Sequence, residues 1–313
     1  MTFPHIDASR QDSLTSDQVE FFKDNGLLVI RNLIAPAELA LLQSETRTLV
    51  DRAVAGDEDP DFAYKEHELT GTRVPFRVEY PVDKLPSCKV LAGHPFVLRS
   101  VEMLQGRNFI PTWDSMVFKN AGAGTGIPWH RDSGDGCGAS KRDRPIFNVD
   151  IYLDASDRSN CVWGIPGSNR WAQERADETI ARLNSGGFST EGATPIEMQP
   201  GDCLFHNILA LHGSAPAQSH LRRVIYYEYR PGETEREFGP HTLGYIPEKQ
   251  RVLAACLRHR AAAPYARGER PFVYRPDADF TAPTLAAGEW PATYRYPHGQ
   301  FWRPPAATIA ATA

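Results

Sequence analysis

The sequence lacks the cysteine patterns that stabilise secreted domains or hold structural zinc. Its five cysteines are scattered, odd in number and never spaced Cys-x-x-Cys, which argues against a disulfide framework and against a zinc knuckle. No apolar run approaches the length of a membrane span, and Met1 to His5 lack the basic-then-apolar layout of a secretory signal. We therefore expect a cytoplasmic protein with free thiols and no membrane partner.

Strongly charged stretches are also missing. The net charge is only −5, with neither a basic run nor an acidic tail, so nothing in the sequence indicates nucleic acid as a partner. The apolar fraction of 41% is typical of a soluble globular protein, and 313 residues are enough for a large core. A small molecule is therefore the expected partner, while the oligomeric state is left open.

Short strands divided by turns dominate the middle of the chain. Clusters of glycine, proline and serine separate eight β-like segments. These lie near residues 113–119, 127–132, 146–153, 161–165, 194–198, 202–207, 210–213 and 222–230. This pattern predicts a mainly β fold with flanking helices, a sandwich or barrel of the jelly-roll type.

Helical patterns flank the β region. Thr15 and Gln18 have the spacing of a capping box, and Gly26 is placed to end the helix that follows. Residues 54–80 are polar and rich in helix breakers, with one short strand at 76–80. Further helices are expected at about 36–53, 95–104, 171–184 and 248–262. We expect one domain over 1–313, with N-terminal helices at about 14–110, a β core at about 111–230, and a C-terminal helix and wrapping tail at 231–313.

The stretch from Pro128 to Asp132 gives the first functional signal. On an extended strand His130 and Asp132 point to the same side, where they provide part of the two-histidine, one-carboxylate ligand set of non-haem Fe(II) oxygenases. A second histidine must come from later in the barrel, and His212 and His206 are the two candidates. Asp135 replaces Asp132 only if the strand ends early.

An arginine pair follows on the last strand of the β region. Arg222 and Arg223 open this strand, and an arginine there can lie one cosubstrate length from the metal. The planar guanidinium suits a carboxylate because it donates two parallel hydrogen bonds. Since a slip of one residue changes which arginine faces inward, both remain candidates, with Arg223 favoured.

These motifs together resemble one enzyme family. Leu14 to Arg31, Lys119 to Asp132, Ile165 to Ser168, Gly201-Asp202 and His212 to Arg223 follow in the order found in the phytanoyl-CoA dioxygenase (PhyH-like) family of Fe(II)/2-oxoglutarate oxygenases. The resemblance implies a double-stranded β-helix and Fe(II), 2-oxoglutarate and O2 as cofactor and cosubstrates. Asn169 and Ala217 depart from the family pattern at positions where histidine and asparagine are common.

The resemblance also assigns roles to residues. It implies that His130, Asp132 and His212 bind the iron and that Arg223 and Ser214 hold the distal carboxylate of 2-oxoglutarate. Apart from the resemblance, Lys119 is a further candidate contact to the cosubstrate. Arg77, Tyr80, Trp163 and His206 are candidate substrate contacts, with His206 more typical of a packed residue beside the metal ligands.

The expected reaction is oxidation of a C–H bond, by hydroxylation, in a medium-sized organic molecule such as a secondary metabolite. Succinate and CO2 are the coproducts. Desaturation, epoxidation and ring closure are alternative outcomes of the same chemistry. Two other functions stay open at this point: a jelly-roll protein that binds a ligand without turning it over, and a zinc hydrolase on the same three ligands.

Overall fold

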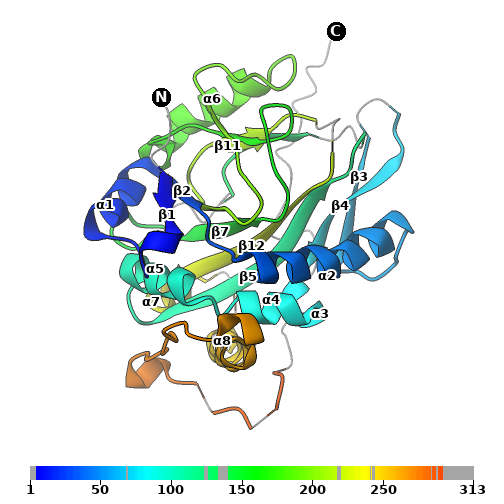
Figure 1. Cartoon of the computed structure of the whole chain (residues 1–313). Helices are drawn as coiled ribbons and strands as arrows, with labels where there is room; N and C mark the ends of the chain where they lie inside the picture. The colour runs from blue at the N-terminus through cyan, green and yellow to red at the C-terminus, as the bar shows by residue number, and fades with distance from the viewer. Residues whose placement is uncertain are drawn as a thin grey trace.

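The computed structural model describes residues 5–67, 70–122, 126–132, 140–216, 220–239, 241, 244–282, 284–286 and 288–291. Within these residues two β-sheets form the body of the protein (Figure 1). The larger sheet has the strand order β1 (His5–Asp7), β2 (Leu27–Arg31), β10 (Cys203–Asn207), β7 (Phe147–Tyr152), β12 (Arg222–Pro231), β5 (Phe109–Lys119), β4 (Arg73–Glu79) and β3 (Phe62–Glu66). The smaller sheet has the order β6 (Ile127–His130), β11 (His212–Ser214), β8 (Val162–Gly164) and β9 (Thr194–Ile196).

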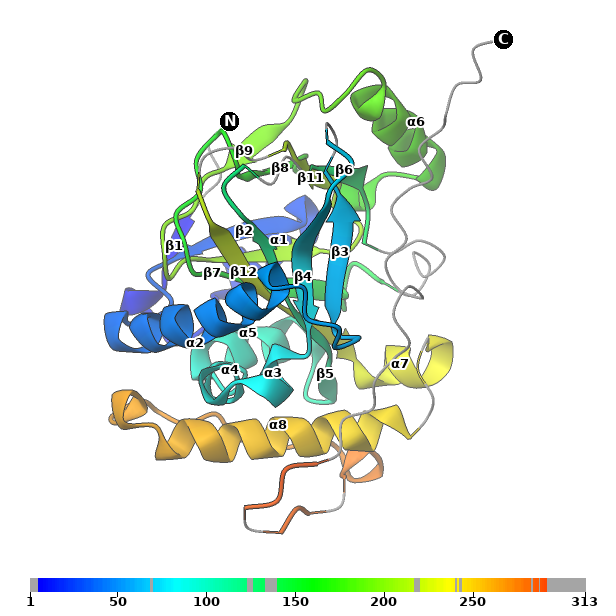
Figure 2. The same cartoon turned by 90° about the vertical axis from the view of Figure 1, so that its right-hand side faces the viewer.

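Helices cover the outer side of the larger sheet. Figure 2 shows the smaller sheet and α6 (Gln173–Asn184) on one side of it, and α2 (Pro36–Val54), α3 (Pro81–Lys84), α4 (Pro86–Leu91) and α8 (Tyr245–Ala262) on the other. The remaining helices are α1 (Ser16–Asn25), α5 (Pro95–Gln105) and α7 (Gly232–Phe238), with short 3-10 turns at Ala8–Arg10, Ser168–Arg170, Pro264–Ala266 and Ala278–Phe280. No described helix is both long and apolar enough to cross a lipid bilayer.

The outer face of the larger sheet is the main core. Alternate residues of β12, such as Ile225, Tyr227 and Tyr229, belong to a large apolar cluster that also contains Phe109 and residues of α2, α4, α5 and α8. Their neighbours in sequence point to the opposite, inner face, because side chains alternate along a strand. Burying the outer residues against the helices therefore fixes which residues of β12 face the smaller sheet.

The strand register places the inner-face residues in rows. Arg222 is paired with Lys119. The next row is Tyr152, Val224, Val117 and Arg77, and the row after it is Asp150, Tyr226, Ser115 and Glu79. A further row pairs Glu228 with Asn148 and Trp113. Polar side chains that lie far apart in the sequence thus line one surface.

The eight strands expected from the sequence are all present, and the two facing sheets form the predicted jelly-roll, the double-stranded β-helix implied by the resemblance. The expectation of a polar loop over residues 54–80 was wrong in part, because β3 and β4 form a hairpin there. β1, α3, α4 and α7 were also not expected; each is short. The division of the chain into a single domain with three parts stays a prediction.

Candidate metal centre and cosubstrate pocket

Three side chains converge between the two sheets. His130 ends β6, His212 begins β11, and the two histidines are directly paired in the register of the smaller sheet. Asp132 lies two residues beyond β6, where its backbone N–H donates to the carbonyl of Ile208 at 3.0 Å. One ligand atom from each of the three residues lies within 4.8 Å of the others. The structure thus brings together the three residues expected from the sequence.

The two histidines present the same ring nitrogen to the centre. Nδ1 of His130 donates to the carbonyl of Pro128 at 2.8 Å, and Nδ1 of His212 donates to the carbonyl of Ala210 at 3.0 Å. With the proton on Nδ1, the lone pair of each Nε2 is free to bind a metal. These nitrogens lie 3.2 and 3.6 Å from Oδ1 of Asp132. Neutral imidazoles and an ionised carboxylate are the forms that a divalent metal requires.

The electrostatics of the site agree with those protonation states. Burial, together with the neighbouring His130, lowers the pKa of His212 to about 3, so its ring is neutral near pH 7. Burial alone would raise the pKa of Asp132, but the neighbouring His212, His130 and His206 hold it well below its usual value. The site is therefore preformed for a cation before one binds.

The second oxygen of Asp132 is held from the larger sheet. His206 of β10 donates through Nε2 to Oδ2 of Asp132 at 2.7 Å and through Nδ1 to Asp150 at 2.6 Å. Asn148 donates to the same Oδ2 at 2.8 Å. Burial would lower the pKa of His206, but Asp150 and Asp132 raise it to about 10. His206 is thus a charged clamp on the carboxylate and lies outside the pocket lining, so the expectation of a substrate contact is wrong for this residue.

Gly213 allows the two histidine strands to lie this close. A Cβ atom built on Gly213 would lie 3.0 Å from the carbonyl oxygen of Ile127, 3.1 Å from the amide of Trp129 and 2.9 Å from the ring of Phe188. Backbone atoms cannot give way as a flexible side chain can. The His-Gly-Ser sequence therefore has a steric reason as well as a chemical one.

A pocket of about 130 Å³ opens beside the three candidate ligands. Their side chains form one part of its lining, and residues of β4, β5, β7 and β12 form the wall opposite. These wall residues include Arg77, Trp113, Asn148, Tyr226 and Glu228. Of the expected substrate contacts only Arg77 lines this pocket. Tyr80 is buried against Trp113 and Trp163 packs in a separate apolar cluster, so these two expectations are wrong.

The arginine expected to face the pocket does not. Arg223 points to the outer side of the sheet, where Nε and Nη2 each donate to Asp154 at 2.8 Å and Nη1 donates to the carbonyl of Gln43 at 2.6 Å. The expectation for Arg223 was wrong because β12 alternates in the other phase: the apolar residues Ile225 and Tyr227 share its face and pack on the helices.

Arg222 occupies the inward position instead. It is fully buried, and Nη1 donates to the carbonyl of Asn160. Within the described part of the chain, Nε and Nη2 have no hydrogen-bond partner, and neither has the hydroxyl of Tyr152. Unsatisfied buried donors are costly and rare in folded proteins. Two parallel donors of one guanidinium fit the carboxylate of a dicarboxylic acid.

The remaining cosubstrate candidates lie next to Arg222. Lys119, its partner in the strand register, donates through Nζ to the hydroxyl of Ser214 at 2.8 Å and to the carbonyl of Ala215 at 2.6 Å. Ser214 lies two residues after the ligand His212 and lines the pocket. Lys119 and Ser214 thus lie together next to the buried guanidinium, and Ser214 also lines the pocket beside His212.

Other residues singled out in the sequence have structural roles or cannot be placed. Asn169 donates to the carbonyl of Lys23 at 3.0 Å and packs against Gly26, so it fixes α1 to the turn after β8. Asp135 and Ala217 lie outside the described residues. Asn148 and Asp150 were missed, because a strand with Asn and Asp at alternate positions carries no recognisable motif.

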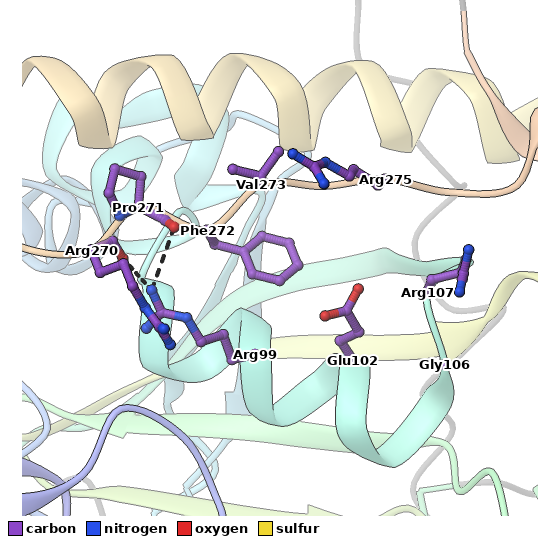
Figure 3. Close-up of a pocket in the computed structure, with 9 residues that line it drawn as sticks. All are labelled: Arg99, Glu102, Gly106, Arg107, Arg270, Pro271, Phe272, Val273 and Arg275. Atoms are coloured by element: carbon purple, nitrogen blue, oxygen red, sulfur yellow. Dashed lines mark hydrogen bonds between the residues drawn. The ribbon is translucent and has the colours of Figure 1, made fainter.

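A second hollow lies away from these residues. Figure 3 shows a groove of about 800 Å³ between α5 and the segment 270–275, with Arg99 donating to the carbonyls of Arg270 and Pro271. Its lining includes the arginines 99, 107, 270 and 275 and one carboxylate, Glu102. One carboxylate without histidine is not a ligand set for iron, so the chemistry is assigned to the pocket between the sheets.

Two facing sheets around a His-x-Asp and a distant histidine define the class of jelly-roll metalloenzymes with a facial triad. The family model described as phytanoyl-CoA dioxygenase (PhyH) matches residues 22–225, and the chain belongs to this family. It is therefore an Fe(II)/2-oxoglutarate-dependent oxygenase that uses Fe(II), 2-oxoglutarate and O2. No curated protein shows significant sequence similarity to it.

Solved structures share the fold. The crystal structure of EvdMO1 has a TM-score of 0.57 and 23% identity, covering 68% of this chain but only 49% of that one. EctD from S. alaskensis with 2-oxoglutarate and 5-hydroxyectoine has a TM-score of 0.57 and 17% identity, covering 72% and 79%. The carbocyclase SnoK from nogalamycin biosynthesis has a TM-score of 0.54 and 17% identity, covering 73% and 91%. At these identities the likeness concerns the fold.

Proposed function

We propose that this chain hydroxylates a C–H bond of a medium-sized natural product, with His130, Asp132 and His212 as the iron ligands and Arg222 as the partner of 2-oxoglutarate. The balanced reaction converts substrate, 2-oxoglutarate and O2 into hydroxylated substrate, succinate and CO2. The convergence of the three ligand atoms within 4.8 Å is the observation that carries this proposal.

Iron and 2-oxoglutarate, when bound, supply the activation of O2 and the oxidising power. The protein supplies position. His206 and Asn148 hold one oxygen of Asp132, which leaves the other oxygen directed at the two histidines. Arg222, Ser214 and Lys119 would orient the keto acid through its distal carboxylate, and the buried inner face would keep bulk water from the reacting atoms.

The carboxylate ligand favours hydroxylation over halogenation. A halide needs an open position on the metal, which a small residue in place of Asp132 would provide, but the aspartate is present and clamped. Ring closure and desaturation start from the same hydrogen abstraction. Mass spectrometry of the oxidised product distinguishes them from hydroxylation, because they remove two hydrogen atoms and add no oxygen, whereas hydroxylation adds one oxygen atom. Epoxidation of an alkene gives the same mass gain as hydroxylation, and NMR of the product separates the two.

The first experiment measures succinate formation and O2 uptake with purified protein, Fe(II) and 2-oxoglutarate. We expect slow succinate formation that depends on Fe(II), rises with substrate and disappears in the His212→Ala variant. A protein that only binds a ligand would show no O2 uptake dependent on 2-oxoglutarate. A zinc hydrolase would retain zinc on purification and would not bind 2-oxoglutarate. Either result would contradict the proposal.

A further inference from the structure

One buried carboxylate organises the wall of the pocket that faces the metal ligands. Glu79 of β4 is 4% exposed. Its Oε2 accepts a hydrogen bond from Nε1 of Trp113 at 2.8 Å, and its Oε1 lies 2.7 Å from Nε of Arg77. Both partners line the pocket, whereas Glu79 is not among its lining residues. A tryptophan and an arginine are thus fixed in place before any ligand arrives.

The tip of Arg77 is available for a ligand. Among the described residues its terminal nitrogens Nη1 and Nη2 have no protein partner, and its side chain is 15% exposed. The guanidinium carbon of Arg77 lies 5.6 Å from the centre of the Trp113 ring. The Trp113 ring is itself stacked on the ring of Tyr80, with 5.9 Å between the ring centres. The pocket therefore presents a rigid guanidinium beside a rigid aromatic ring.

The other arginine of this wall, Arg230, has more of its nitrogens in contact with protein groups. Arg230 donates through Nε to Glu228 at 2.7 Å and through Nη1 to the carbonyl of Gly239 at 3.1 Å. The same oxygen of Glu228 also accepts from the hydroxyl of Thr112 at 2.6 Å. Arg77 is also paired with one carboxylate, Glu79, but through Nε alone, so both of its terminal nitrogens can receive an anion.

Arg77 is also separate from the proposed cosubstrate position. It pairs with Val117 in the register, whereas Arg222 pairs with Lys119, two residues further along β5 and two strands away from β4. Two residues correspond to about 7 Å along a strand. Arg77 lines the pocket, whereas Arg222 is fully buried at a different position of the inner face, so the two guanidiniums can hold two separate acidic groups.

We propose that the substrate is an organic acid whose carboxylate pairs with Nη1 and Nη2 of Arg77 and whose hydrocarbon part packs against Trp113. This inference rests on the proposed function and names the class of substrate for the same site. A carboxylate is the anion of choice because its planar shape matches the guanidinium fork. The target C–H bond then lies between Arg77 and the iron ligands.

The test uses matched probes that differ only in the acid group. The full-length protein is loaded with Zn(II), which does not turn over, and saturated with 2-oxoglutarate so that the cosubstrate position is filled. Binding of 3-phenylpropanoate and 3-phenylpropanamide, and of the corresponding cyclohexyl pair, is measured by ligand-observed NMR titration. We expect each acid to bind about 10-fold or more tightly than its amide, the gain typical of a charge-assisted pair.

Variants of single arginines test which residue causes the preference for acids over amides. Arg77→Gln should bring acids and amides to equal affinity, and Arg77→Lys, which keeps the charge without the fork, should lose part of the preference. Arg275→Gln in the groove of Figure 3 is the matched control and should change nothing. Affinity for 2-oxoglutarate and the melting temperature report whether each variant is folded.

Three outcomes would overturn the inference: equal binding of acids and amides by the wild-type protein, an unchanged preference in a folded Arg77→Gln variant, or no saturable binding of any acid. If 2-oxoglutarate itself fails to bind the metal-loaded wild type, the proposed function fails first. If 2-oxoglutarate binds and the acid preference is absent, only the substrate class is wrong.

Discussion

The two sheets differ in what they contribute to the site. The smaller sheet has strands of three or four residues and supplies the two histidines, whose positions depend on one pairing and on the absence of a side chain at Gly213. The larger sheet is covered by helices and supplies Asn148, His206 and Arg222. The comparison teaches that the smaller sheet positions the two histidines directly, whereas the larger sheet acts on the metal site through Asp132 and also forms the opposite wall of the pocket.

Removal of a ligand on the smaller-sheet side should have the largest effect. We expect Asp132→Gly to lower substrate hydroxylation by about 1,000-fold or more, because no other described carboxylate lies with the two histidines. The melting temperature should fall as well, because the buried His206 and Asn148 lose the carboxylate that accepts their hydrogen bonds, so activity is compared at a temperature at which the variant is folded. Product formation and iron content measure the effect, and an unchanged hydroxylation rate would exclude Asp132 as a ligand.

Substitutions of the adjacent residues Arg222 and Arg223 should have different effects, because the two side chains lie on opposite faces of β12. Arg222→Gln should raise the KM for 2-oxoglutarate about 100-fold, the loss expected for a buried charge-assisted pair, with iron affinity retained. Arg223→Gln should instead lower stability by about 3 kcal/mol, because it leaves Asp154 without its bidentate partner. The KM for 2-oxoglutarate and the free energy of unfolding are the two readouts, and the reverse pattern would restore Arg223 to the pocket.

A smaller effect is expected at the contact between the sheets. His206→Asn should weaken iron binding by about 10- to 100-fold, the usual cost of losing a residue that orients a ligand. Affinity for 2-oxoglutarate in the zinc-loaded protein should stay within about twofold. His259→Asn on α8 is the matched control. Equal iron affinity in wild type and His206→Asn, measured by competition with a chelator, would show that the clamp on Asp132 is not needed.

The last prediction concerns the helical cover alone. Burial and the neighbouring Arg260 lower the pKa of His94 to about 3, so the folded state keeps this ring neutral while the unfolded chain protonates it below about pH 6.5. Stability is therefore full above that pH and falls as pH decreases toward 3. The loss is about 2 kcal/mol at pH 5. Denaturant unfolding of His94→Gln should show a weaker dependence between pH 7 and pH 5, and an identical slope would refute this.

Sequence-based prediction succeeded for features that are defined by residues close together in the chain. His130 and Asp132 are two residues apart, and the capping box of Thr15 and Gln18 closes within four residues, as observed. The eight core strands could be predicted because each is bounded by turn residues. In these cases local physical chemistry and the final fold agree.

The sequence failed where the answer depends on strand phase or on distant partners. The choice between Arg222 and Arg223 is decided by the apolar contacts of Ile225 and Tyr227 with the helices, which a local pattern does not reveal. Glu79 meets Trp113 only through the pairing of β4 with β5. β3 was missed because the breaker-rich residues before it mask a strand that is stabilised by its hairpin partner.

The tight fit at Gly213 sets a limit on how this enzyme can vary. Any larger residue there would push the backbone of β11 away from β6, and since each strand carries one imidazole, the two rings would separate together with the strands. A methyl group at this position would thus change the coordination geometry although Gly213 itself offers no ligand atom to the metal. New activities in this scaffold are therefore expected to arise from changes in the wall of the larger sheet, while the two paired strands that carry the histidines stay constant.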